Sequence, residues 1–578
     1  MSYFKKLEKE ILTAINDAGY ELESFSLLRS NRKDLGDYQI NEAMSLAKKY
    51  KMNPHQIAEN IVKELEKNNH LKDIDIAGPG FINFRLTDEF LIEFANSLVN
   101  DITSNVDKHD KRRRFILDYG GANVAKTLHV GHLRPANIGE ALKRLLELLG
   151  NEVIGDVHFG DSGLQVGQVI LEMKERYPDL PCFRDDYNGE DFELPIDARD
   201  LDEIYPTASK KSKEDESFRE EAARITLGIQ KREGALFKLW EKIMKISVED
   251  IKKAYEYLNC TFDLFEGELD SFNYMEDMDK DLVSKGLLED SEGAKIVRVA
   301  EDTDKKELPP FLVYKSNGAA LYGTTDLATI YGRVKRFNPD AIWYVVDKRQ
   351  DMHFELLFRV VHKAHLKENL ELELQGFGTM NGEDGKPFKT RTGGVVTLRS
   401  LIAMVKEIVK AKLKDNISEE EKDKIADQIT IAAIKFADLS PYRVTDYIFD
   451  PEKFADVEGK TGPYILYAVT RMNSLISKAG VYDQKITSID SETERNIFLT
   501  LLEMPNSINK AYKMRSLNEI CDYLYNLASQ FNTLYGETHI LNEENKTKRD
   551  SLITLITIIN EALVLLLDVL AIEVPAKM

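Results

Sequence analysis

Apolar and polar residues in the middle of the chain follow a pattern that predicts a strand, a turn, a helix and a second strand. Residues 115–117 and 153–159 are short apolar runs of the kind that form buried strands. Between them, the apolar positions of residues 138–149 recur at helical spacing, and Gly150 marks the end of that helix. Residues 120–123 are small and form a turn after the first strand. Since parallel strands need a crossover connection, the pattern indicates a βαβ unit.

The residues before this unit predict a small α+β domain over residues 1–110. Helical periodicity dominates residues 3–18 and 40–67. Residues 74–86 are typical of two strands joined by a Gly-Pro-Gly turn.

The residues after the second strand continue the α/β pattern with an interruption. Residues 173–220 are charged and contain four prolines, which predicts an irregular insertion between two halves of a sheet. Residues 216–258 then return to helical periodicity, and residues 341–346 predict another buried strand. We therefore expect a second, α/β domain with a parallel sheet over residues 111–397.

The last part of the chain, residues 398–578, predicts almost only helices. Residues 552–571 are apolar enough to be mistaken for a membrane span. However, Thr554, Glu561 and Asp568 recur every seven residues and form one polar stripe. We interpret this segment as a helix of a bundle, and we expect no membrane association.

Composition predicts a soluble protein of several domains. The chain has 578 residues, of which 43% are hydrophobic and 31% charged, which is typical of folded domains with a large core. Cys182, Cys260 and Cys521 lie far apart, which argues against a disulfide framework or a cysteine-based zinc site and fits a reducing compartment. The first residues contain no apolar run of signal-peptide length, so we expect a cytoplasmic protein.

The net charge of −21 is unusual for a nucleic-acid-binding protein, which normally carries a basic excess. Basic residues cluster only locally, at residues 111–114, 386–391 and 546–549. Such runs are also common on solvated faces, so charge alone neither supports nor excludes RNA.

Two histidines stand at the start of the predicted helix of the βαβ unit. His129 and His132 are three residues apart, and Gly131 between them lets a ligand approach the backbone. A glycine-rich turn before a helix also presents backbone N–H groups and the positive end of the helix dipole, which suits a polyphosphate. A strand before the pair and a helix after it favour this interpretation over surface or core packing.

These segments resemble class I aminoacyl-tRNA synthetases, and specifically the arginyl enzymes. Residues 120–134, GGANVAKTLHVGHLR, are similar to the family pattern S-P-N-x-A-K-P-x-H-V-G-H-L-R, which contains the HIGH signature. Further similarities, which together cover essentially every domain, are found in AGPGFINF (77–84), GDSGLQVG (160–167), YGTTDLA (322–328), YVVDKRQ (344–350), the KMSKS-like GKPFKTRTG (385–393) and GKTGPYILYAVTR (459–471).

The resemblance implies a Rossmann-like catalytic domain over residues 111–397, with an insertion at about 173–220. It also implies an N-terminal tRNA-contacting α+β domain over residues 1–110 and an all-α anticodon-binding domain over residues 398–578. The implied reaction is ATP-dependent ligation of L-arginine to the terminal adenosine of tRNA(Arg), through arginyl-adenylate and transfer to the 2′-hydroxyl. ATP is then a substrate, Mg²⁺ is bound with ATP, and the protein is expected to be a monomer.

A guanidinium is a planar set of donors, so reading it requires carboxylates and acceptors at fixed spacing. Tyr322 and Asp326 lie one helical turn apart, and Gln350 follows the next strand. The alternative is that they are polar residues on a helix surface. The resemblance assigns the arginine substrate to these residues and three others, Glu268, Asp118 and Asn123.

The resemblance assigns the phosphate chemistry to basic and glycine residues. His129 and His132 would contact the ATP phosphates, and Lys386, Lys389 and Lys126 would supply mobile positive charge. Lys126 precedes the HIGH motif, where a lysine is thought to compensate for a missing KMSKS lysine. The implied ATP-binding residues are His129, Gly131, His132, Gly160 and Lys389.

RNA contacts are expected from aromatic and amide side chains, which suit unstacked bases. In the N-terminal domain these are Phe81, Asn83 and Phe84, although the two phenylalanines fit core packing equally well. In the C-terminal domain the residues that match the family's anticodon-contacting positions are Tyr464, Tyr467 and Met578, with Tyr535 as a further candidate. Tyr464 or Tyr467 could instead belong to the core.

The sequence departs from the family pattern at six positions: Gly120, Gly121, Ala122, Thr127, Ser162 and Thr325. These departures leave open a catalytically silent paralogue that binds tRNA or arginine as a regulator. A small-molecule nucleotidylyltransferase shares the HIGH-type fold, but it would not need two RNA-facing domains.

Overall fold

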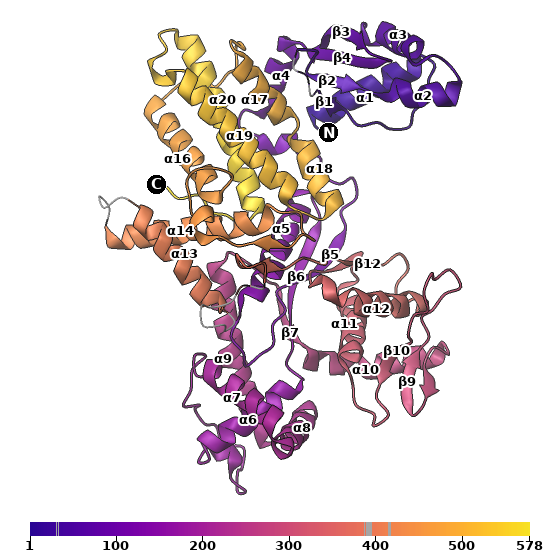
Figure 1. The fold of residues 1–578 in the computed structure, drawn as a ribbon, viewed down its shortest axis with the longest axis vertical. Helices are drawn as coiled ribbons and strands as arrows, with labels where there is room; N and C mark the ends of the chain where they lie inside the picture. Colours follow the sequence, from indigo (N-terminus) through magenta and orange to yellow (C-terminus); the bar gives the residue numbers. More distant parts are fainter. Residues whose placement is uncertain (31, 33, 387, 389–395, 414–417) are drawn as a thin grey trace.

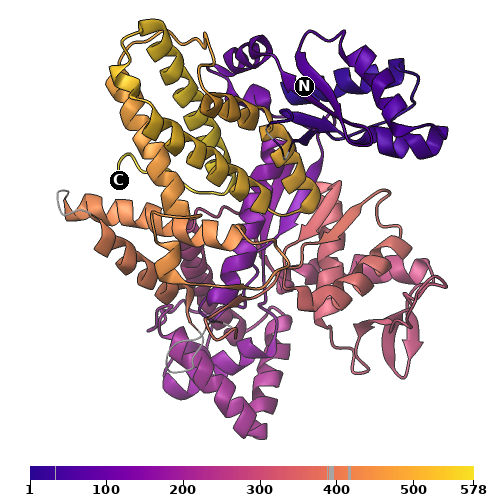
Figure 2. The same ribbon diagram turned by 45° about the horizontal axis from the view of Figure 1, so that its top comes forward.

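The computed structural model describes residues 1–30, 32, 34–386, 388, 396–413 and 418–578. Figure 1 shows an N-terminal unit and a C-terminal helical bundle above a central sheet, with two further lobes below the sheet. Figure 2 shows that the N-terminal unit lies beside the bundle, at the opposite end of the molecule from the helical insertion.

The N-terminal unit is an antiparallel sheet of order β1-β2-β4-β3 covered by helices. Its elements are α1 (Tyr3–Asp17), β1 (Leu28–Arg29), β2 (Tyr38–Ile40), α2 (Glu42–Tyr50), α3 (Pro54–Leu65), β3 (Leu71–Ala77), β4 (Phe81–Leu86), α4 (Asp88–Leu98) and η1 (Ile102–Asn105).

The two strands predicted within residues 74–86 are present as β3 and β4, and the helical periodicity over residues 40–67 is confirmed except at its start. Ile40 belongs to β2, and the rest forms two helices. Lys51 ends α2 in the left-handed conformation, with φ of 53°. The Asn53 side chain then caps α3, whose first residue is Pro54. A left-handed residue followed by a new cap stops one helix and starts another.

The central sheet is parallel, with the order β12-β11-β5-β6-β7. Its strands are β5 (Arg114–Asp118), β6 (Glu152–Phe159), β7 (Leu264–Gly267), β11 (Ala341–Tyr344) and β12 (Glu371–Leu374). The predicted βαβ unit is confirmed as β5, α5 (Leu133–Leu148) and β6. The chain leaves β5 toward β6 and later returns to β11 on the other side, so the order reverses between β5 and β11. Open α/β sheets bind ligands at such a switch point.

Helix α5 is buried on almost every side and begins after the short 3₁₀ helix η2 (Val130–His132). At Gly139 a Cβ atom would lie 2.1 Å from the ring of Tyr119, so only glycine lets α5 approach the end of β5 this closely. Arg134, in the first turn of α5, forms a buried ion pair of 2.9 Å with Asp438 of the C-terminal half. The helix start is therefore anchored to both halves of the chain.

The insertion is mostly a helical lobe, although residues 177–200 are irregular apart from one short 3₁₀ helix, as predicted. It contains α6 (Leu164–Arg176), η3 (Pro181–Phe183), α7 (Leu201–Glu214), α8 (Glu216–Gln230) and α9 (Ala235–Tyr257). The expected disruption by Pro206 is wrong, because this residue lies inside α7, where it removes a single backbone donor. The helix expected over residues 216–258 is interrupted at Arg232 and Gly234, whose φ angles are 58° and 88°.

A second lobe adds a small antiparallel sheet to the other side of the core. It contains α10 (Glu268–Ser284), β8 (Glu289–Ser291), β9 (Ala294–Val297), β10 (Phe311–Tyr314), α11 (Tyr322–Phe337), η4 (Lys348–Gln350) and α12 (Asp351–Lys363). Among the described residues, no three His, Cys, Asp or Glu side chains are grouped as a metal site.

The C-terminal part is helical apart from the parallel pair β13 (Met380–Asn381) and β14 (Tyr447–Ile448). Its helices are α13 (Leu398–Lys412), α14 (Glu419–Leu439), α15 (Pro451–Phe454), α16 (Gly462–Ala479), α17 (Glu492–Leu502), α18 (Met504–Met514), α19 (Asn518–Glu537), η5 (Ile540–Asn542) and α20 (Lys546–Val569). Among the described helices, α20 alone is long and apolar enough to cross a membrane by length and composition. It packs against α16 and α19 with most of its apolar residues buried, as a core helix does.

Candidate active site

A cavity of about 440 Å³ opens at the carboxyl ends of the central strands, at the switch point between β5 and β11. It lies among the ends of β5, β6 and β11, the start of α5 and the first turns of α10 and α11. Ten residues that the sequence singled out line it together: Asp118, Asn123, His129, Gly131, His132, Gly160, Glu268, Tyr322, Asp326 and Gln350.

His129 and His132 form a reciprocal cap before α5. The Nδ1 atom of His132 accepts the backbone N–H of His129 at 3.0 Å, and Nδ1 of His129 accepts that of Gly131 at 3.0 Å. Burial, with a smaller contribution from the charge of Lys126, lowers the pKa of His129 to about 4. Burial likewise lowers the pKa of His132 to about 3. Both rings are therefore neutral at pH 7.

The cap also decides which ring nitrogen can donate. Since each Nδ1 accepts a backbone N–H, the ring proton of each histidine belongs on Nε2. The pair is thus two neutral N–H donors beside the cavity, suited to phosphate oxygens. The backbone N–H of Gly131 is already used by His129, so the free backbone donor expected at this glycine is absent.

Asp118 is not a free carboxylate, because a buried arginine holds it. The Nη2 atom of Arg333 lies 2.6 Å from Asp118 Oδ2 and 2.5 Å from Asp156 Oδ2, and its side chain is only 1% exposed. Burial alone would lower the pKa of Arg333, but the two carboxylates raise it well above its usual value. Sequence reasoning missed Arg333 and Asp156. The signal was an arginine seven residues after Asp326, on the same helix face.

Tyr322, Asp326 and Gln350, the residues predicted to read a guanidinium, all line the cavity. The Tyr322 hydroxyl donates to Gln350 Oε1 at 3.4 Å. Asp326 is 7% exposed, and its Oδ2 lies 2.6 Å from Nε2 of His353. His353 was missed by sequence reasoning, although it stands three residues after Gln350, where α12 begins.

Glu268 lies at the start of α10 and accepts a short hydrogen bond from the Ser162 hydroxyl. Ser162 is one of the six departures from the family pattern, and here its hydroxyl donates to a carboxylate of the cavity. Burial raises the pKa of Glu268 above its usual value. Burial also raises the pKa of the neighbouring Asp161 to about 7, and its Oδ1 accepts the backbone N–H of Leu269 at 2.9 Å.

The predicted catalytic lysines do not line this cavity in the described part of the chain. Lys126 places its Nζ over the ring of Tyr205 in the insertion, 5.4 Å from the ring centroid. Lys386 is exposed, and its backbone N–H binds Asp384. Lys389 lies outside the described residues. Arg349, which sequence reasoning missed, lines the cavity and pairs with Asp347 at 2.6 Å.

The expected RNA contacts of the N-terminal unit are contradicted for two of three residues. Phe84 and Asn83 are both fully buried, so neither offers a face to a base. Phe84 stacks on Tyr38, and Asn83 accepts a hydrogen bond from Gln39. Strand β4 is buried on both faces at Asn83 and Phe84. The alternation of apolar and polar residues in the sequence does not show that both faces are buried. Phe81 is half-buried.

In the C-terminal bundle, Tyr467 and Tyr535 are 41% and 40% exposed and enclose one guanidinium between them. The Arg471 side chain lies 4.5 Å from the Tyr467 ring and 4.8 Å from the Tyr535 ring. The result is an exposed platform of two aromatic rings and a cation, shared by α16 and α19.

The other two residues expected at this RNA-facing surface are less accessible. Tyr464 is half-buried, and its hydroxyl accepts from Asn532 at 2.8 Å and donates to Ser529 at 3.2 Å. Met578 is half-buried against the core at the end of the chain.

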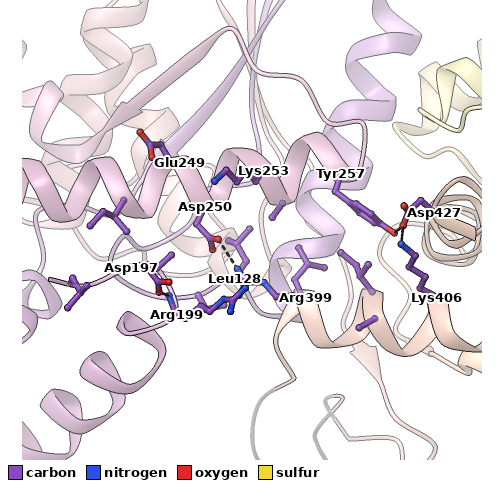
Figure 3. Close-up of a pocket in the computed structure, with 18 residues that line it drawn as sticks. Leu128, Asp197, Arg199, Glu249, Asp250, Lys253, Tyr257, Arg399, Lys406 and Asp427 are labelled. Atoms are coloured by element: carbon purple, nitrogen blue, oxygen red, sulfur yellow. Dashed lines mark hydrogen bonds and ion pairs between the residues drawn. The ribbon is translucent and has the colours of Figure 1, made fainter. Parts of the chain in front are cut away.

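A larger cavity, of about 730 Å³, lies on the other side of the segment that leads to His129. Figure 3 shows it between α9 and α13, with Arg399 facing Asp250 and Lys406 facing Asp427. These charges are paired with one another, and most of the remaining lining is apolar. None of the predicted site residues that the structure describes lines it, so the smaller, polar cavity is the candidate active site.

Comparison with known proteins covers the whole chain. The sequence profile described as tRNA synthetases class I (R), catalytic domain, matches residues 93–451. The profiles for the arginyl tRNA synthetase N terminal domain and the DALR anticodon binding domain match residues 5–86 and 465–578. Arginine–tRNA ligase of Alkaliphilus oremlandii is 43% identical and that of Agathobacter rectalis 41%, each over 99% of this chain and at least 99% of its own length.

Solved structures show the same fold. Arginyl-tRNA synthetase from Plasmodium falciparum superposes with a TM-score of 0.82 at 24% identity, covering 99% of both chains. The Thermus thermophilus arginyl-tRNA synthetase has a TM-score of 0.81 at 20% identity and covers all of both chains.

Proposed function

The chain belongs to the arginyl-tRNA synthetase family, and on that premise we propose that it ligates L-arginine to the 3′-terminal adenosine of tRNA(Arg) with ATP. The single observation that supports this most strongly is the cavity itself. It places acceptors suited to a guanidinium on one wall and two neutral N–H donors suited to phosphates on another. A regulator that binds arginine without catalysis would not need the two N–H donors suited to phosphates.

The arginine side chain would bind between α11 and the end of β11. Asp326 supplies the carboxylate, and Tyr322 and Gln350 supply further polar contacts, with Glu268 facing them from α10. The α-ammonium and carboxylate would then lie toward Asp118 and Asn123. Charge-assisted hydrogen bonds of this kind set both the affinity and the orientation of a guanidinium.

The first chemical step would be attack of the arginine carboxylate on the α-phosphorus of ATP, with pyrophosphate as leaving group. The protein forms no covalent bond in this step, so catalysis rests on positioning and on stabilising the phosphoryl oxygens. The Nε2–H groups of His129 and His132 are preorganised donors for that charge, and they carry no positive charge of their own at pH 7.

Lys126, Lys386 and Lys389 are proposed to supply positive charge to the phosphates after the substrates bind. Mg²⁺ would accompany ATP by bridging its phosphate oxygens, because Mg²⁺ prefers phosphate and water ligands to an all-protein cage. The arginyl group would finally pass to the 2′-hydroxyl of the terminal adenosine.

We further propose three functional domains: residues 1–110 and 398–578 bind tRNA, and residues 111–397 carry out catalysis. The exposed platform around Tyr467 would stack on anticodon bases. The protein would act as a cytoplasmic monomer without membrane contact.

Arginine-dependent ATP–pyrophosphate exchange, measured with and without tRNA, together with charging of tRNA(Arg), tests this function. We expect exchange that depends on arginine and charging of the tRNA. Binding of tRNA or arginine without either reaction would instead support a silent regulator. Exchange that depends on a different acid would refute the choice of substrate.

A further inference from the structure

Asp326 depends on one side chain for its orientation. Among the described residues, the His353 ring is the one hydrogen-bond partner of the Asp326 carboxylate, with Nε2 2.6 Å from Oδ2. An ionised carboxylate can only accept, so Nε2 carries the proton of this hydrogen bond. The bond occupies Oδ2 and leaves Oδ1 of Asp326 for a ligand.

The same ring supports the second residue of the guanidinium pocket. The His353 and Tyr322 rings pack with their centroids 4.9 Å apart. At Gly323, between Tyr322 and Asp326, a Cβ atom would lie 2.9 Å from the Phe311 ring and 3.6 Å from the His353 ring. The first turn of α11 is therefore pressed against His353, which leaves little freedom for either residue.

His353 itself stays behind the cavity. It stands in the first turn of α12, and the cavity is lined by its neighbours Gln350 and Phe354 rather than by its ring. It is packed edge-on against Phe354, with ring centroids 5.2 Å apart. A side chain in this place can act on a bound guanidinium only through the residues that it holds.

We propose that His353 is a positioning residue for the guanidinium of the arginine substrate. It holds the Asp326 carboxylate in one orientation and supports the Tyr322 ring, so it sets the affinity for arginine without taking part in the phosphoryl step. This inference rests on the proposed function. It goes beyond it by naming a specificity-determining residue outside the cavity wall.

Three variants test the proposal by tRNA-supported ATP–pyrophosphate exchange. His353→Ala removes the donor and the ring, and should raise KM for arginine by about 10–100-fold, the effect expected for a hydrogen bond to a charged group. KM for ATP and kcat should change by less than about threefold. His353→Gln can place an amide N–H near the position of Nε2 and should recover most of the arginine affinity. His362→Ala, on the exposed face of the same helix, is the matched control and should behave as wild type.

A purely structural role would give a different pattern. Equal rises in KM for ATP and arginine, or a His353→Gln variant as impaired as His353→Ala, would overturn the proposal. So would a His353→Ala variant with wild-type KM for arginine. Circular dichroism of each variant verifies that it is folded.

Titration calorimetry of L-arginine, and of its uncharged isostere L-citrulline, keeps the two proposals separable. If wild type shows no arginine-dependent exchange, the proposed function fails. A loss of arginine affinity in His353→Ala, with unchanged weak citrulline binding, would still support the positioning role. Equal arginine affinity in wild type and His353→Ala would refute it.

Discussion

Replacing Asp326 with asparagine should remove arginine recognition while leaving the fold intact. The substitution preserves shape, and the amide oxygen can still accept the hydrogen bond from His353 that Oδ2 accepts now. The amide nitrogen must then take the place of Oδ1 and point its own N–H groups at the N–H groups of the guanidinium. The cavity would present a donor where the substrate offers only donors.

The magnitude follows from the burial of this group, which is 7% exposed. Losing a hydrogen bond to a charged group costs about 1.5–3 kcal/mol, and leaving a buried donor without a partner costs about 1–3 kcal/mol more. At about 1.4 kcal/mol for each factor of ten, the combined effect is a loss of about 10²–10⁴ in kcat/KM for arginine.

The assay is arginine-dependent ATP–pyrophosphate exchange in the presence of tRNA, with kcat/KM for ATP as an internal reference. Asp277→Asn serves as the matched control, because Asp277 is an exposed residue of α10 that pairs with Lys335 at the surface. A kcat/KM for arginine within threefold of wild type in Asp326→Asn would show that this carboxylate does not bind the guanidinium.

Further predictions concern the phosphates, the pH dependence and the RNA. His132→Ala should lower the exchange rate by about 10²–10³-fold with little change in ATP affinity, as for a donor used in the transition state. Rapid kinetics and ATP titration measure the two effects, and weaker ATP binding with an unchanged rate would contradict this role. In the folded protein the pKa of His129 is about 4 and that of His132 about 3, whereas in the unfolded chain both have a pKa of about 6.5. Below pH 6.5 the unfolded chain therefore binds protons that the folded protein does not bind. The contribution of these histidines to stability is complete above pH 6.5 and is lost on acidification. Asparagine does not titrate, so replacing both histidines with asparagine should remove this loss. The melting temperature of the variant minus that of wild type, measured by scanning fluorimetry, should therefore be more positive at pH 5 than at pH 8. Tyr467→Ala should weaken tRNA(Arg) binding by about 1–3 kcal/mol, and removal of Met578 should also weaken it, both without loss of helical circular dichroism. Unchanged affinity in both variants, measured by tRNA titration at fixed salt, would move the anticodon contact elsewhere.

Local patterns were sufficient to predict the elements of the core. The apolar runs around β5 and β6 and the helical spacing of α5 predicted the βαβ unit, because these periodicities arise from burial of one strand or helix at a time. The helical periodicity did not reveal the break at Lys51, although Asn53 and Pro54 mark the start of a new helix, and it did not reveal that Pro206 lies inside a helix. There, packing by neighbouring elements decides the conformation.

For the candidate site, too, the sequence predicted some features and only the structure revealed others. The sequence motifs assigned His129, His132 and Asp326 to the substrates, and all three line one cavity at the carboxyl ends of the central strands. No local pattern could show that Arg333 pairs with Asp118, 215 residues away in the chain. Similarly, no pattern could show that His353 holds Asp326.

The sequence by itself predicted which residues are candidates for the chemistry, since a turn suited to phosphates and a set of acceptors suited to a guanidinium are readable from residue type and spacing. Only the tertiary structure decided which of those groups are free. Burial lowers the pKa of both histidines and encloses Phe84 and Asn83 in the N-terminal core. Hydrogen bonds occupy the Gly131 N–H and one carboxylate oxygen of Asp326. The physical reason is that hydrogen bonds, ion pairs and desolvation depend on neighbours brought together by folding, and chain order does not specify those neighbours.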